Sequence, residues 1–188
     1  PATETRLSLL LTELGLDSLD ALVESLKEQG STGALLEKTI GVLTHRPDQF
    51  FKDYKVFKFI RKAIFPYLAK RQPPPNPLRA VVIGDAIGTD VYSLSILADE
   101  SPWGPKRKFE VAGYDISKTA AEFHRVGLYD AQTIASSMPA AFLKSHFQEA
   151  GEHWRIAPRH HERCTFTEVH PELEWPNARP FDLVVLRN

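Results

Sequence analysis

The sequence has little cysteine, no long apolar run and no excess of charge of either sign. Its single cysteine, Cys164, excludes an internal disulfide and favours a reducing compartment, so we expect a cytoplasmic protein. No stretch approaches the roughly 18 apolar residues of a membrane-spanning helix and no signal peptide is visible, so we expect no membrane insertion. The formal net charge is −1. Because such a chain has no overall basic field, we expect no nucleic-acid partner.

The length and the two ends of the chain set further expectations. With 188 residues, 43% of them hydrophobic, the chain is long enough for an α/β body and a smaller helical part. It starts at Pro1 without a methionine and stops at Asn188, directly after an apolar segment. Because a fold rarely ends so abruptly, we expect native sequence beyond Asn188. A shortened sheet also exposes a strand edge, which would invite a homodimer.

Apolar residues recur at helical spacing along the first part of the chain, which predicts a helical N-terminal domain over residues 1–70. Four helices are expected: from residue 5 to Gly15, from Asp17 to Gly30, over 34–43, and from near Asp48 to Leu68. The proline-rich stretch 71–77 cannot continue a helix. We therefore expect a linker and a domain boundary there.

Strands and helices alternate after the linker. We expect strands over 78–83, 108–114, 163–169 and 181–186, and helices over 91–100 and 118–126. This order is typical of an α/β fold with a parallel, Rossmann-like sheet, here over residues 78–188. Residues 127–162 exceed what one crossover needs. They predict an inserted subdomain with a helix near 137–147 and a strand at 154–156.

A glycine-bounded turn follows the first expected strand. Gly84 and Gly88 let the backbone bend sharply and approach a ligand closely, which a side chain at either position would obstruct. Asp115 comes at the end of the second expected strand, where a ribose finds its hydrogen-bond acceptor in this kind of fold. Together these residues predict a site for an adenosine-bearing ligand. The structural alternative is that the glycines and Asp115 only form turns.

Six short motifs follow one another along the chain: residues 15–19, Phe50-Phe51-Lys52-Asp53, residues 84–93, 113–117 and 127–129, and Phe181-Asp182-Leu183 with Arg187-Asn188. Taken in order, they resemble the CheR family of chemotaxis methyltransferases. Each motif is weak alone, but their order and spacing agree with the family from Thr5 to Asn188. The resemblance implies S-adenosylmethionine as cofactor, S-adenosylhomocysteine as the spent cofactor, and methylation of receptor glutamates in chemosensory signalling as the activity.

The resemblance also implies roles for particular residues. Lys52 replaces the signature arginine and would orient the acceptor carboxylate as a point charge, which makes it the candidate catalytic residue. Asp115 would accept hydrogen bonds from the ribose hydroxyls, and Asp90 would approach the amino end of the methionine part. Asn188 matches the family at the cofactor site, and His170 stands where the family usually has asparagine.

Several of these residues have a plainer interpretation. Lys52 fits a solvated lysine, and Asp90 fits an acid that stabilises the N-terminus of a helix. Arg46 and Asp48 would sit where uncharged polar groups face the cofactor in the family. They either pair and plug the pocket, or Asp48 caps the helix that carries the two phenylalanines.

Histidines and a cysteine in the second half of the chain raise the question of a metal. The spacing of His153, His160, His161, Cys164 and His170 fits no tight ligand pattern, so we expect no metal site. A Ser-His-Asp hydrolase is disfavoured too, since no nucleophile-elbow sequence is present.

Two functions of different class stay open at this stage. The first is a CheR-like methyltransferase acting on protein carboxylates. The second is a degenerate methyltransferase fold that serves as a non-catalytic interaction or regulatory module, which the changes at Arg46, Asp48, Lys52 and Ala86 favour. In both cases the expected partner is a protein, such as a chemoreceptor or another signalling protein.

Overall fold

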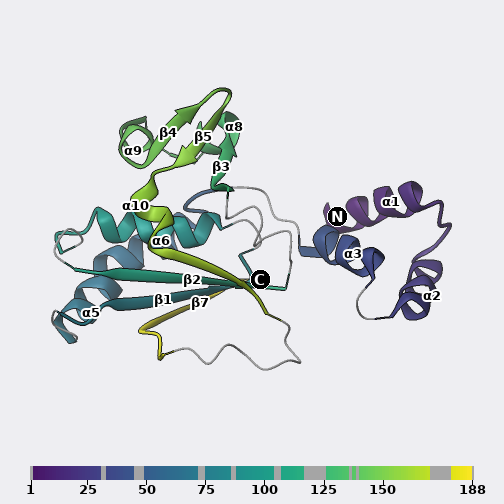
Figure 1. Cartoon of the computed structure of the whole chain (residues 1–188), viewed down its shortest axis with the longest axis horizontal. Helices are drawn as coiled ribbons and strands as arrows, with labels where there is room; N and C mark the ends of the chain where they lie inside the picture. The colour runs from purple at the N-terminus through teal and green to yellow at the C-terminus, as the bar shows by residue number, and fades with distance from the viewer. Residues whose placement is uncertain are drawn as a thin grey trace.

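The computed structural model describes residues 2–30, 33–44, 49–71, 75–85, 88–103, 107–116, 126–135, 137–138, 140–169 and 179–187. Figure 1 shows an α/β body, a small subdomain above it and three helices to one side. The helix expected over 118–126 lies almost wholly outside the described residues.

A parallel four-stranded sheet forms the centre of the body, as the alternation of strands and helices predicts. Its order is β6-β2-β1-β7, and all three pairings are parallel. The strands are β1 (Leu78–Ile83), β2 (Phe109–Asp115), β6 (Cys164–Glu168) and β7 (Leu183–Leu186). The register of β1 and β2 pairs Ile83 with Tyr114, so both strands end at the same edge of the sheet. The Rossmann-like α/β fold expected from the sequence is confirmed.

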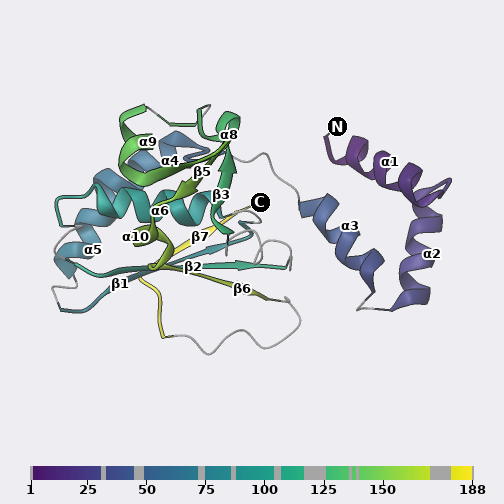
Figure 2. The same ribbon diagram turned by 45° about the horizontal axis from the view of Figure 1, so that its top comes forward.

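Helix α6 (Thr89–Asp99) is the layer between the sheet and the inserted subdomain, and its residues from Thr89 to Ala98 are all buried. Figures 1 and 2 both show it in this position. Val91 and Leu94 pack into the core above the sheet. Tyr92 and Ile96 pack into the core of the subdomain. A helix with apolar residues on both sides is stable only when both sides are covered.

One continuous helical stretch also packs on the sheet. It consists of α4 (Tyr54–Phe59), the π-helical segment η1 (Ile60–Ile64) and α5 (Phe65–Arg71). The backbone N–H of Phe65 donates to the carbonyl of Ile60, five residues earlier. Pro66 follows directly, and the wider turn before it relieves the clash that a proline ring makes inside a regular helix.

The inserted subdomain is built on a small antiparallel sheet of order β3-β5-β4. Its elements are β3 (Leu128–Asp130), α8 (Ala131–Ala135), α9 (Ala140–His146), β4 (Phe147–Ala150) and β5 (His153–Ile156). The short helix α10 (Pro158–His161) leads from it back to β6. The sequence predicts the helix and the last strand, whereas the strands at 128–130 and 147–150 are new.

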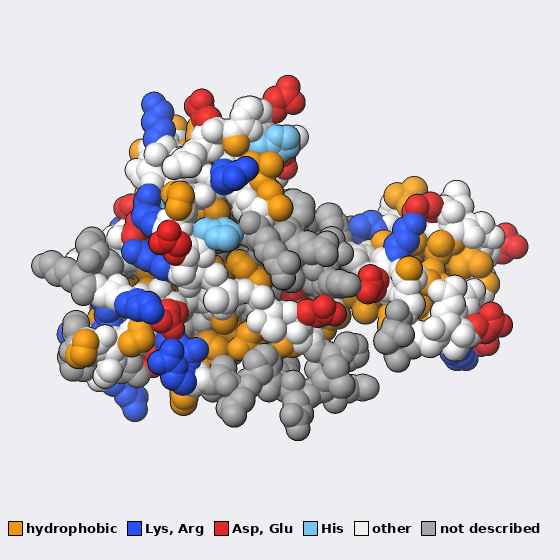
Figure 3. Space-filling model, viewed as in Figure 1, with side chains coloured by type: hydrophobic (Ala, Val, Ile, Leu, Met, Phe, Trp, Pro, Cys, Tyr) orange, Lys and Arg blue, Asp and Glu red, His pale blue; other side chains and the backbone are white. Residues whose placement is uncertain are grey.

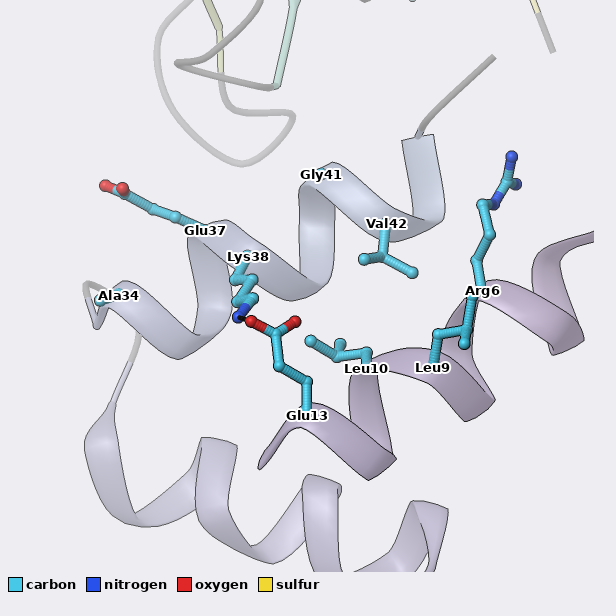
Figure 4. A pocket seen from close by; sticks show the side chains of 9 residues that line it. All are labelled: Arg6, Leu9, Leu10, Glu13, Ala34, Glu37, Lys38, Gly41 and Val42. Atoms are coloured by element: carbon cyan, nitrogen blue, oxygen red, sulfur yellow. Dashed lines mark hydrogen bonds and ion pairs between the residues drawn. The ribbon is translucent and has the colours of Figure 1, made fainter. Parts of the chain in front are cut away.

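The first three helices form a core of their own. Helices α1 (Ala2–Leu14), α2 (Leu19–Gln29) and α3 (Ala34–Thr44) meet around Leu10, Leu22 and Leu35. A hollow of about 600 Å³ lies between α1 and α3. Figure 4 shows Glu13 and Lys38 forming an ion pair between these two helices.

The fourth expected helix begins later than the sequence suggests. It starts at Tyr54, and the two phenylalanines precede it in a turn over residues 50–53. The prediction that Asp48 caps a helix carrying Phe50 and Phe51 is therefore wrong for those two residues, and Asp48 itself lies outside the described part. The reason is tertiary: the ring of Phe50 and the backbone N–H of Phe51 contact distant segments, as described below.

The boundary predicted at 71–77 stays a prediction. The packing groups the helices differently, because Phe57, Phe65 and Leu68 of the fourth stretch share a core with the sheet. We infer that the unit carrying the sheet begins before Phe50.

The surface agrees with the balanced composition. On the face shown in Figure 3, acidic and basic side chains are interspersed over the body. Within the described residues, no helix combines the length and the apolar character needed to cross a bilayer.

Candidate functional site

The turn between β1 and α6 brings the backbone close to the end of β7. Gly84 and Gly88 both adopt the left-handed conformation, with φ of 82° and 71°. The N–H of Gly84 donates to the carbonyl of Tyr114 at 2.8 Å. A Cβ at Gly84 would lie 3.0 Å from the carbonyl oxygen of Arg187. Glycine is therefore required here by conformation and by space.

Asp85 fixes the start of α6. Its carboxylate accepts the backbone N–H groups of Asp90 at 3.0 Å and of Val91 at 2.9 Å. The side chain is buried. Burial, reinforced by the nearby charges of Asp90 and Asp115, raises the pKa of Asp85 to about 8. The sequence gives Asp85 no role, because it lies three residues before the N-cap position of Gly88, where no local capping pattern marks it.

Asp115 lies where the adenosine prediction needs it. It is the last residue of β2 and is buried. Its backbone carbonyl accepts the N–H of Val169 at 2.8 Å, which fixes the end of the strand. In open parallel sheets, ligands bind outside the carboxyl ends of the strands. Asp115 and the turn at Gly84 meet at that edge.

Arg187 joins two acids from separate parts of the chain. Its Nε donates to Asp90 Oδ2, and its Nη1 lies 2.6 Å from Asp53 Oδ2. The Arg187 and Asp90 side chains are 13% and 6% exposed. The two carboxylates raise the pKa of Arg187 in spite of the burial that lowers it. The sequence marks Arg187 only as part of a motif, and nothing local predicts its partners.

The turn over residues 50–53 is anchored by aromatic rings and by α6. Phe50 makes edge contacts with Tyr129 and Phe147 of the inserted subdomain. The N–H of Phe51 donates to Ser93 Oγ at 2.9 Å. Phe51 and Asp53 both have positive φ, 52° and 62°. Non-glycine residues adopt this conformation only where their surroundings impose it, often at functional sites.

Lys52 lies between these two left-handed residues and is half-buried. It is thus part of a fixed turn and not of a solvated helix. Asp53, the next residue, is connected through Arg187 to Asp90. Two ion pairs therefore connect the turn that carries the candidate catalytic residue to a candidate cofactor residue.

The remaining candidates lie outside the described residues. These are Arg46, Asp48, Ala86, His170 and Asn188.

The described residues fit an adenosine-bearing ligand with an amino-acid tail. A close backbone turn, a buried acid at the end of β2 and an acid in the first turn of α6 supply the expected acceptor groups. Asp90 is already engaged by Arg187, so a ligand ammonium group would share this carboxylate with the guanidinium.

A second polar cluster lies at the other end of α6. Ser95 Oγ is 2.9 Å from His160 Nδ1, His160 Nε2 is 2.9 Å from His146 Nδ1, and His146 Nε2 is 3.0 Å from Glu100 Oε1. Burial and the neighbouring His146 lower the pKa of His160 to about 3, and burial also lowers the pKa of His146. The sequence singles out His160 but not His146, because residues 14 apart meet only through the fold.

Comparison with known proteins decides the family. The CheR methyltransferase, SAM binding domain family matches residues 47–188. The chain belongs to the CheR methyltransferase family. It therefore carries the domain with which these methyltransferases bind S-adenosylmethionine, and the cofactor predicted from the sequence is confirmed at the level of the family.

One curated relative is a much longer protein than this chain. The chain is 26% identical over 141 residues to an uncharacterised 104.1 kDa protein in the hypE 3′ region of Rhodobacter capsulatus. The match covers 74% of this chain but only 15% of that protein.

Proposed function

We propose that this domain transfers a methyl group from S-adenosylmethionine to glutamate carboxylates of a protein in a chemosensory signalling system. The observation that carries the proposal is the connection of the Lys52 turn to Asp90 through Asp53 and Arg187, next to the edge where Asp115 ends β2. An acceptor-side lysine and cofactor-side acids are thereby held as one unit.

Each residue has a definable task in this reaction. Asp115 accepts hydrogen bonds from the ribose hydroxyls, and Asp90 faces the ammonium of the methionine part. The cofactor, when bound, supplies a methyl group already activated on a sulfonium. The chain therefore needs to align the acceptor with that methyl group more than it needs acid or base chemistry. Lys52 orients the acceptor carboxylate as a single positive charge.

A second candidate function is a binding module that has lost turnover. Two observations favour it: Arg187 already engages the Asp90 carboxylate, and Lys52 replaces an arginine that would grip a carboxylate with two parallel hydrogen bonds. In that case the turn and the inserted subdomain serve protein binding and regulation.

The first experiment is titration calorimetry of this chain with S-adenosylhomocysteine. We expect a dissociation constant on the order of 1–100 μM. Asp115→Ala is expected to weaken binding by about 10–100-fold, since a charged hydrogen-bond acceptor is lost. Glu168→Ala is the matched control, because Glu168 is an exposed acid beside Asp115 at the end of the neighbouring strand. Equal loss in both variants would argue against the assigned pocket.

The second experiment separates the two functions. The full-length protein is incubated with S-adenosylmethionine carrying a labelled methyl group and with signalling proteins of the same cell. A methyl ester on glutamate is expected to appear as label that alkali releases from the protein. Lys52→Ala should abolish this label and Lys52→Arg should retain it. Cofactor binding without any such label would favour the non-catalytic module.

A further inference from the structure

Two histidines of the second polar cluster and the neighbouring Asp99 form a group that can bind a metal ion. Asp99 stands at the end of α6, His146 at the end of α9 and His160 in α10, and their ligand atoms all lie within 4.8 Å of one another. Both histidines are fully buried. The Asp99 side chain is 18% exposed and lies toward the surface side of the cluster.

We propose that Asp99, His146 and His160 form a binding site for a divalent transition-metal ion of the zinc type. Two imidazoles and a carboxylate suit zinc and its first-row neighbours, whereas magnesium and calcium prefer oxygen ligands alone. This proposal revises the expectation of no metal, which considered His160 with other histidines and Cys164 but missed His146 and Asp99.

The spacing of the imidazoles supports the site. His146 Nδ1 and His160 Nε2 face each other at 2.9 Å. Two nitrogens that bind one ion at about 2.05 Å lie about 2.9 Å apart at a right angle and about 3.3 Å apart at the tetrahedral angle. The distance between the two nitrogens therefore needs to change by only a few tenths of an ångström, and the rings need to turn so that both lone pairs point at the ion.

The outer nitrogen of each ring also has a suitable partner. His146 Nε2 contacts Glu100, and His160 Nδ1 contacts Ser95. Histidines that bind metals almost always donate their other N–H to a carboxylate or another oxygen, which fixes the ring and its tautomer. If His146 donates its Nε2–H to Glu100, its Nδ1 accepts the Nε2–H of His160. Metal binding would then move the His160 proton from Nε2 to Nδ1, where it can be donated to Ser95 Oγ, so no net proton is lost.

Two arginines are the competitors of the metal. Arg159 donates to Asp99 and lies 3.1 Å from His146 Nδ1 through its Nη2, and Arg163 donates to the other Asp99 oxygen. These hydrogen bonds lower the pKa of Asp99, although burial alone would raise it. The Arg159 side chain is 43% exposed, so it can turn into solvent and release a carboxylate oxygen and the Nδ1 lone pair.

Removing Arg159 should change the metal affinity in a direction that tells the proposed site from a purely structural cluster. A guanidinium that only stabilises the cluster would leave metal affinity unchanged when removed. A guanidinium that occupies the metal position would, on removal, tighten binding. Bound metal would then hold α9 and α10 of the inserted subdomain onto the end of α6.

The test uses Co²⁺, whose visible absorption reports its ligands, and Zn²⁺ in calorimetry on the whole chain. We expect one Co²⁺ per chain that Zn²⁺ displaces, several-fold tighter binding in Arg159→Met, and loss of binding in Asp99→Asn and His146→Gln. Glu100→Gln should weaken binding by about 10-fold, as outer hydrogen-bond partners do. His153→Ala is the control and should bind as the parent chain does, because His153 is exposed and belongs to β5.

The proposal is overturned if neither the parent chain nor Arg159→Met gives the cobalt spectrum. It is also overturned if Asp99→Asn binds as tightly as the parent. Thermal unfolding of each variant without metal shows which ones fold. Should His146→Gln not fold, Arg159→Met and Asp99→Asn still decide the outcome, because they carry opposite expectations.

Discussion

At the scale of single residues, Arg187 joins three segments of the described site that are far apart in the sequence. It lies just after β7, and its guanidinium reaches Asp90 in the first turn of α6 and Asp53 before α4. Asp90 is buried, and its ion pair with Arg187 offsets part of the cost of keeping a carboxylate away from water.

Replacing Arg187 by methionine should therefore lower the free energy of unfolding by about 3 kcal/mol, since the buried Asp90 carboxylate loses its ion pair with the guanidinium. Adding Asp90→Asn to Arg187→Met should recover most of that loss. Chemical denaturation of the two variants measures both effects. Lys27→Met removes an exposed ion pair and should cost at most about 1 kcal/mol. An equal effect of Lys27→Met and Arg187→Met would contradict the assignment.

Asp85 leads to a prediction about pH. Its pKa is raised to about 8 by burial, whereas an unfolded aspartate titrates near 3.9. Between these values the folded state binds more protons than the unfolded state, so this contribution to stability is full below about pH 4 and is lost as the pH rises to about 8. The stability difference between the parent chain and Asp85→Asn should fall with rising pH, by at most about 1.4 kcal/mol per unit.

Denaturation of both chains at pH 5, 6, 7 and 8 tests this sign. A difference that grows with pH would mean that the two N–H groups of α6 outweigh burial and keep Asp85 ionised.

At the scale of elements, the turn over residues 50–53 and the helix α6 depend on each other. Ser93 Oγ accepts the N–H of Phe51 at 2.9 Å and donates to the carbonyl of Thr89 at 2.6 Å. One hydroxyl thus joins the candidate catalytic turn to the first turns of the helix that follows the glycine turn.

Ser93→Ala should lower the free energy of unfolding by about 1–3 kcal/mol, because the buried N–H of Phe51 loses its acceptor. It should also weaken binding of S-adenosylhomocysteine by loosening the turn that carries Lys52. Ser25→Ala is the matched control, since Ser25 makes the same bond to a carbonyl four residues earlier in α2 and, in the part of the chain that the structure describes, no bond to a distant segment. Chemical denaturation and calorimetry on both variants measure these effects. Ser93→Ala should lower both the stability and the affinity, whereas Ser25→Ala should leave the affinity unchanged.

The turn also shows where sequence-based prediction ends. The strand β1 and the helices α2 and α3 follow from apolar spacing, glycine stops and capping, which are local properties. The turn does not, because the sequence pattern extends the fourth helix back to near Asp48 and phenylalanine rarely has positive φ. The contacts with Tyr129 and Ser93 override that local pattern, and they bring together parts of the chain more than 40 residues apart.

The candidate site likewise has residues that the sequence predicts and contacts that it does not. Gly84, Gly88, Asp90 and Asp115 could be predicted, since the turn and the strand end are local features of a known supersecondary unit. The partners of Arg187 and the pairing of His146 with His160 could not, because each arises when separate elements pack.

At the scale of the whole molecule, the core of the first three helices shares no residue with the other cores of the described residues. Leu10, Leu22 and Leu35 meet only within the first three helices. The helical stretch from Tyr54 to Arg71 belongs with the sheet.

A chain that starts at residue 45 should therefore unfold cooperatively and bind S-adenosylhomocysteine within a few-fold of the parent. A chain that starts at residue 72 should not fold, since the sheet would lose the side of its core formed by Phe57, Phe65 and Leu68. Thermal unfolding followed by circular dichroism and calorimetry compares the two. Folding of the shorter chain would restore the boundary predicted at 71–77.

The burial of α6 along almost its entire length has a consequence for communication across the domain. The helix has 11 residues and is about 16 Å long, with Asp90 at one end and Asp99 at the other. A helix packed on all sides moves as a rigid rod, so a small shift along its axis displaces both ends together. An ion bound at Asp99 and a cofactor bound at Asp90 would then be coupled through one body, and by reciprocity each would change the affinity of the other by the same factor.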